Sequence, residues 1–178
     1  MSMPGGRFDV FLAYSGAQTR RRAVARIFCQ QLESCVKGRF RGAGFCWHPR
    51  IFFGDRDIDV SLGEGWFEIV GEILGDVQIL VLMFTGVTVG DLKAVGSSAG
   101  HYLEFEAFGE LMKKSPEGDR EILSIDLRDV ADGELEHGNV REIDPDRLRA
   151  EVDRICGRIF HWFSGRFGVD GVPLDGCR

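Results

Sequence analysis

A nearly continuous apolar run, VQILVLMF over residues 77–84, constrains the fold more than any other feature of the chain. The run does not alternate between apolar and polar positions, so it predicts a strand covered on both faces in the middle of a parallel sheet. It is too short to cross a lipid bilayer, which takes roughly 20 apolar residues in a helix. The run therefore favours an α/β fold in which helices pack on both faces of one sheet.

Patterns typical of strands and helices alternate along the rest of the chain. The other expected strands are residues 8–14, 50–53 and, near the sheet edge, 121–127. The expected helices are residues 18–38, a helix from 61 onward, residues 101–114 and a helix from 145 onward. Gly38 is expected to end the first helix, and Ser61 and Glu64 form a capping box for the second. Asp144, followed by proline, is the expected N-cap of the last helix.

This alternation predicts right-handed crossovers and a parallel sheet, whose ligands bind outside the carboxyl ends of the strands. The loops that begin at Ser15, Asp55 and Thr85 leave those ends. A length of 178 residues, with 44% hydrophobic and 28% charged residues, suits one globular domain. We therefore expect a single compact unit.

Charge and cysteine content exclude several classes of protein. The net charge of -6 disfavours a nucleic-acid partner, and the amino terminus lacks the apolar segment of a secretory signal. Five cysteines occur with no CxxC spacing, and an odd number cannot all pair within one chain. Reduced thiols and a cytoplasmic location, away from membranes, are the expectation.

Common catalytic motifs are missing from the sequence. No GxGxxG follows the first strand, and no GxxxxGK[ST], HExxH or GxSxG occurs. The four histidines are too dispersed to predict a metal site, and we expect each to be packed or exposed. Any chemistry must come from a less regular site.

Two carboxylates near the start of the third helix are the main candidates for such a site. Glu104 and Glu106 lie two residues apart, which is about 200° around a helix axis, so only one can face the strand ends. Glu106 has Tyr102 one turn before it and Gly109 three residues after it, which leaves room for a ligand. Glu104 neighbours Phe108 and is expected to be the solvated member of the pair. The pattern also fits a Glu106 that is an ordinary surface carboxylate.

Three segments in order resemble the motifs of TIR (Toll/interleukin-1 receptor) domains. Residues 8–15 (FDVFLAYS) resemble the opening strand, and 55–58 (DRDI), leading through Gly63 to Trp66, resemble the second motif, with a longer loop than usual. Residues 79–84, the serine-containing loop and 102–106 (YLEFE) are similar to the stretch that carries the family's glutamate, one turn after an aromatic residue. Tyr102 stands where tryptophan is frequent.

The resemblance spans residues 7–125 and, more loosely, the terminal helix. It implies a flavodoxin-like three-layer sandwich whose central parallel sheet has five strands, with helices on both faces. The domain is then expected to cover residues 7–166, after a disordered amino terminus at 1–6. Residues 167–178 have loop composition and are expected to be a tail, or the start of a linker toward a sensor domain.

The activity that the resemblance implies is NAD+ glycohydrolysis. Such an enzyme cleaves the bond between nicotinamide and ribose, with cyclisation of ADP-ribose as a variant. The resemblance also implies that self-assembly with other TIR domains activates the enzyme. The expected role is that of an immune or anti-phage effector. Glu106 would be the catalytic residue, and NAD+ is the substrate, so no bound cofactor or metal is expected. Cleavage builds positive charge on the ribose and releases neutral nicotinamide, so a fixed carboxylate suffices without a general acid.

Further residues carry expected contacts with NAD+. Tyr14, Ser15 and Tyr102 would hold the nicotinamide ribose, and Arg20 or the next two arginines would meet the pyrophosphate. The loop with Arg56 and Gly63 would gate the pocket and contact a neighbouring subunit, and Trp66 would line it. Plainer interpretations stay open: a solvated first helical turn for the arginines, loop-ordering charges for Arg56 and Asp57, and a core position for Trp66.

Two other functions compete with the hydrolase. One is a non-catalytic adaptor that binds other TIR domains through its surface. The other is a receiver-like or flavodoxin-like domain. The receiver is disfavoured because no acidic pair follows the first strand and no lysine ends the fourth. The paired Glu106 and Tyr102 favour the enzyme over the adaptor, which needs neither.

Overall fold

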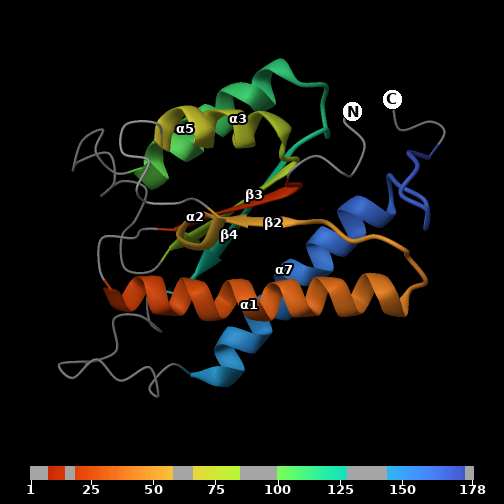
Figure 1. The fold of residues 1–178 in the computed structure, drawn as a ribbon, viewed down its shortest axis with the longest axis horizontal. Helices are drawn as coiled ribbons and strands as arrows, with labels where there is room; N and C mark the ends of the chain where they lie inside the picture. Colours follow the sequence, from red (N-terminus) through yellow and green to blue (C-terminus); the bar gives the residue numbers. More distant parts are fainter. Residues whose placement is uncertain (1–7, 15–18, 58–65, 85–99, 128–143, 175–178) are drawn as a thin grey trace.

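A parallel sheet lies between two helical layers in the computed structural model, which describes residues 8–14, 19–57, 66–84, 100–127 and 144–174 (Figure 1). Four strands, β1 (Val10–Tyr14), β2 (Ile51–Phe53), β3 (Ile79–Phe84) and β4 (Glu121–Asp126), pair in the order β2-β1-β3-β4. The register aligns Val10 with Ile51 and Ile79, and Ile79 with Glu121. The α/β three-layer fold and the central β3 are therefore confirmed, and β4 lies at the edge of the four strands that the structure describes. The described residues form four strands rather than the expected five.

One face of the sheet is covered by α1 (Thr19–Gly42) and α7 (Pro145–Ser164). Asp144 caps α7 as predicted, because its Oδ1 accepts from the backbone N–H groups of Asp146 (2.9 Å) and Arg147 (3.2 Å). The prediction that Gly38 ends α1 is wrong. A helical glycine costs only about 1 kcal/mol, and the next turn buries Phe40 fully against aromatic rings that include Phe45 and Phe160.

The other face is covered by α3 (Trp66–Asp76) and α5 (Gly100–Lys114), in agreement with the expected helices. The predicted capping box of α3 lies outside the described residues. Between β2 and α3 the chain forms a helical turn, α2 (Gly54–Asp57), where a loop was expected. Asp57 stabilises this turn by accepting a hydrogen bond from the Phe53 N–H at 2.7 Å, so the loop-ordering interpretation of Asp57 fits its described contact.

Arg120 joins the end of α3 to the start of β4. Its Nη1 donates to the carbonyl oxygens of Leu74 (2.9 Å) and Val77 (2.8 Å), and its Nη2 donates to that of Gly75 (2.6 Å). Its Nε donates to Ser115 Oγ at 3.1 Å. One guanidinium thus pairs the carbonyl groups that a helix leaves without partners at its carboxyl end.

Arginines of α7 contact the outer edge of β4. The N–H groups of Glu121 and Leu127 bond toward β3 residues, so the carbonyl groups of Ser124 and Asp126 point the other way. Arg154 donates to the Ser124 oxygen at 2.6 Å, and Arg147 donates to the Asp126 oxygen at 3.3 Å. Arg158 pairs with the Glu121 side chain at the start of the same strand.

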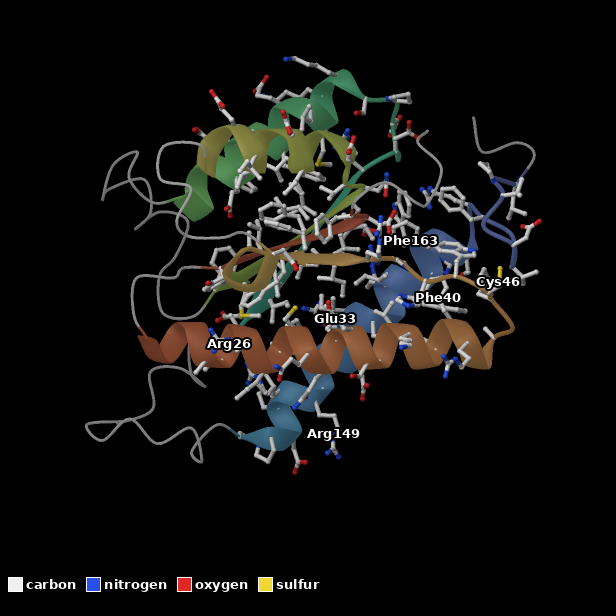
Figure 2. The ribbon with its side chains drawn as sticks, in the orientation of Figure 1. Arg26, Glu33, Phe40, Cys46, Arg149 and Phe163 are labelled. Atoms are coloured by element: carbon white, nitrogen blue, oxygen red, sulfur yellow. The ribbon has the colours of Figure 1, made fainter. Side chains whose placement is uncertain are left out.

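Residues 167–174 pack on the domain instead of leaving it. Phe167 is buried and pairs with Pro173 in an antiparallel bridge, and Trp47 Nε1 donates to the Gly168 oxygen at 3.0 Å. The Trp47 ring also contacts Phe40 of α1 and Phe163 of α7; Figure 2 labels both phenylalanines. The packed unit therefore extends past the boundary expected at residue 166. Among the described residues, no helix is long and apolar enough to cross a membrane.

Candidate active site

The first turns of α1, α3 and α5 lie at the carboxyl edge of the sheet. Each of these helices follows a parallel strand, so its amino end lies where that strand ends. In this fold class, ligands bind at that edge. Any titratable group that α5 places there is a candidate for chemistry.

Glu104 is the carboxylate of α5 that points inward. It is only 9% exposed, and Phe108, one turn later on the same side of the helix, is fully buried in the cluster formed with α3 and the sheet. Burial raises the pKa of the Glu104 carboxyl to about 8, because removal from water disfavours the charged form. A carboxyl group that is mostly protonated at neutral pH, at the edge where such sheets bind ligands, is a common feature of functional sites.

The predicted orientation of the two carboxylates is wrong. Glu106 and Ala107 are exposed, whereas Glu104 and Phe108 are buried. The helix turns Phe108 toward the core and leaves the smaller Ala107 on the exposed side. This rotation moves Glu104 in and Glu106 out. The catalytic role assigned to Glu106 stays an untested prediction, without the inward geometry that motivated it.

Tyr14 lies on the other face of the sheet from Glu104. Its ring is half-buried against the α1 and α7 cluster, with its centroid 5.1 Å from that of Phe53. Glu104 belongs to the helix that covers the opposite face. The structure therefore places both residues at the same edge but does not bring them together on one face.

The structure describes the remaining predicted contacts only in part. Ser15 and Gly63 lie outside the described residues. For four others the backbone alone is described: Arg20 in the first turn of α1, Arg56 in α2, Trp66 at the start of α3 and Tyr102 in the first turn of α5. All four backbone positions lie in helices that come after strands in the chain, and their contacts with NAD+ stay predictions.

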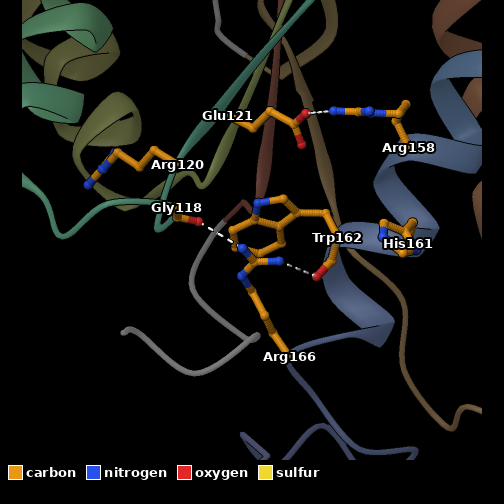
Figure 3. A pocket seen from close by; sticks show the side chains of 7 residues that line it. All are labelled: Gly118, Arg120, Glu121, Arg158, His161, Trp162 and Arg166. Carbon is orange, nitrogen blue, oxygen red and sulfur yellow. Dashed lines mark hydrogen bonds and ion pairs between the residues drawn. The ribbon is translucent and has the colours of Figure 1, made fainter. Parts of the chain in front are cut away.

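Two cavities of about 390 Å³ each occur elsewhere. In the first, shown in Figure 3, Arg166 lies 4.1 Å from the Trp162 ring and donates to the Gly118 oxygen, while Arg158 pairs with Glu121. The second lies beside α1 and the start of β2. Neither is lined by a residue of the predicted site. Within the described ranges, no group of three or more His, Cys, Asp or Glu side chains is arranged to hold a metal ion.

Comparison with protein-family models finds no match, and no curated protein matches the chain in sequence.

Proposed function

We propose that the domain cleaves the nicotinamide–ribose bond of NAD+, with Glu104 rather than Glu106 as the carboxylate that faces the ribose. The observation that carries the proposal is the buried Glu104 carboxyl near the start of α5, whose pKa burial raises to about 8. The order of the three TIR-like motifs supports the choice of NAD+ as substrate. The parallel sheet supports the location, because its carboxyl edge is where such folds bind nucleotides.

A buried carboxylate suits this reaction. As the bond to the pyridinium breaks, positive charge moves onto the ribose, and the leaving nicotinamide is neutral and takes no proton. An anion in a site of low dielectric constant stabilises that charge more than the same anion in water does. Binding of the cationic nicotinamide ring next to Glu104 favours the ionised form of the carboxyl group, since a nearby opposite charge lowers its pKa.

Glutamine substitutions at the two carboxylates test the assignment. NAD+ consumption is measured at high protein concentration with a crowding agent for wild type, Glu104→Gln and Glu106→Gln. The first variant is expected to lose activity by about a hundredfold or more, the loss typical of removing one electrostatic stabiliser. The second is expected to stay within about threefold of wild type, because its side chain is exposed.

The reverse result would return the catalytic role to Glu106. Equal turnover by all three proteins would exclude both carboxylates. Circular dichroism of each variant shows that a loss of activity is not a loss of fold.

Activity is also expected to rise with pH. With a pKa of about 8, the Glu104 carboxyl is ionised in about one-tenth of the free protein at pH 7. The value of kcat/KM follows the free enzyme, so it should increase about tenfold per pH unit between pH 6 and 8 and level off above pH 8. A profile that is flat over this range, measured with wild type in a constant-ionic-strength buffer, would contradict a role for ionised Glu104.

A non-catalytic adaptor is the second candidate. The outward face of α5 exposes Glu106, Ala107 and Glu110, a surface available for contact with another domain. Self-association measured by analytical ultracentrifugation, together with no NAD+ turnover in wild type at any concentration, would favour the adaptor. A specific activity that increases with protein concentration would instead support a hydrolase activated by assembly.

A further inference from the structure

Two cysteines meet where α1 packs on α7. Cys156 of α7 is fully buried, and Cys35 of α1 is half-buried against the same core cluster. The thiol groups of Cys156 and Cys35 lie close enough to interact, and this contact helps to raise the pKa of Cys156. The Cys35 thiol also donates to Asp153 Oδ1 at a sulfur–oxygen distance of 3.8 Å, and Asp153 lies one turn before Cys156. The Cys35 thiol thus contacts the turn of α7 that carries Cys156, and both side chains pack in the same core cluster.

Arg39 completes this cluster. Its guanidinium lies 5.4 Å from the Phe160 ring centroid, near enough to Cys156 to lower the pKa of that thiol. Gly157 leaves space for it, because a Cβ at that position would come within 3.3 Å of Arg39 Nη1. Burial raises the pKa of the Cys156 thiol to about 12, and Arg39 acts in the opposite direction. Cys156 is therefore a protonated, protected thiol at rest, while Cys35 is the one that solvent reaches.

We propose that Cys35 and Cys156 form an intramolecular disulfide when the protein meets a peroxide, joining α1 to α7. The Cys35 thiolate attacks one oxygen of hydrogen peroxide, the O–O bond breaks, and Cys35 becomes a sulfenic acid with release of hydroxide. The Cys156 sulfur then attacks the Cys35 sulfur. The S–S bond forms as the S–O bond breaks, and the departing hydroxide takes the Cys156 proton as water. Two thiols and one peroxide give one disulfide and two waters.

Other cysteines of the described chain provide controls. Cys29 is buried on α1 but belongs to an earlier turn, and Cys46 is exposed and contacts the Val169 oxygen. Cys29→Ala removes the other buried thiol of α1, so a link that persists in this variant does not involve Cys29. Cys46→Ser removes an exposed thiol that could link two molecules. Neither substitution touches the Cys35 and Cys156 contact.

The test treats purified full-length Cys46→Ser protein with hydrogen peroxide and maps peptides without reductant by mass spectrometry. A peptide pair that contains residues 35 and 156 and separates with dithiothreitol is the expected product. The melting temperature should rise by roughly 5 to 10 °C on oxidation, because the link closes a loop of more than a hundred residues, and it should fall back on reduction. Cys29→Ala should give the same yield of the peptide pair, and Cys35→Ser should give none.

Cys156→Ala supplies an independent readout, since Cys35 then has no partner and its sulfenic acid should accumulate and react with dimedone. Cys35→Ser keeps the test valid if Cys156→Ala unfolds, because Cys35 is only half-buried. The proposal is overturned if folded wild type accumulates oxidised Cys35 without the peptide pair, or if Cys35 is linked to Cys29 instead.

Discussion

At pH 9, Glu104→Gln is expected to be more stable than wild type by up to about 5 kcal/mol, and at pH 4 the two proteins should be equally stable. The cause is the raised pKa of the Glu104 carboxyl, about 8 in the folded protein against 4.5 for an ordinary glutamate. Below pH 4.5, Glu104 is protonated in both the folded and the unfolded chain, so its titration costs nothing.

At a pH between 4.5 and about 8, Glu104 loses its proton in the unfolded chain but keeps it in the folded chain. The folded state then binds more protons, so the free energy of unfolding falls as pH rises from 4.5 to about 8 and is level above that. Glutamine does not titrate, so the free energy of unfolding of the variant does not fall with pH for this reason. The same substitution is expected to reduce NAD+ cleavage, which is the trade-off between stability and activity common at functional carboxyl groups.

Urea unfolding followed by circular dichroism at pH 4, 6, 8 and 9 measures the difference between the two proteins. Subtracting wild type from variant cancels the titration of all other groups. Glu106→Gln, on the exposed side of the same helix, should differ from wild type by no more than about 0.5 kcal/mol across the range. Parallel stability curves for wild type and Glu104→Gln would show that Glu104 is not buried in solution.

Arg120→Met is expected to lower the free energy of unfolding by about 3 to 4 kcal/mol. The variant keeps the apolar stem but removes the donors that pair the carbonyl groups of Leu74, Gly75 and Val77. The part-buried carbonyl groups of Leu74 and Val77 then lose their partners, which costs more than the hydrogen bonds themselves are worth. Arg120→Lys should recover less than half of the loss, because an ammonium group cannot reproduce the fork of the guanidinium.

Urea unfolding monitored by tryptophan fluorescence measures this effect. Lys113→Ala is the matched control, since Lys113 pairs with exposed Glu110 one turn away on the same helix, and its removal should not measurably change the midpoint. An Arg120→Met protein within about 1 kcal/mol of wild type would show that water replaces the guanidinium at the end of α3.

Local sequence patterns predicted most of the fold. The apolar run at 77–84 identified the central strand, and Asp144 identified the start of α7, because both signals are contained in a few adjacent residues. Gly38 was misleading because its local cost is small beside the burial of Phe40, which depends on residues far along the chain. The contact of Trp47 with Gly168, 121 residues apart, is another long-range effect that no local pattern reports.

The candidate site was only half predictable. The sequence showed that only one of Glu104 and Glu106 can face the strand ends, but both rotations of α5 bury apolar residues. Packing against α3 and the sheet decides between them, and it selects Phe108 over Ala107. Weighting each apolar position by side-chain size would have favoured the rotation that the structure shows, since a phenylalanine gains more from burial than an alanine.

The arginines along β4 restrict how copies of this domain can assemble. An exposed parallel edge invites a strand from another molecule, which leads to open-ended growth of a sheet. Here a foreign strand would have to displace Arg154 from Ser124 and Arg147 from Asp126 before it could bond to the same carbonyl groups. Within the described residues, these two contacts therefore discourage strand addition along β4.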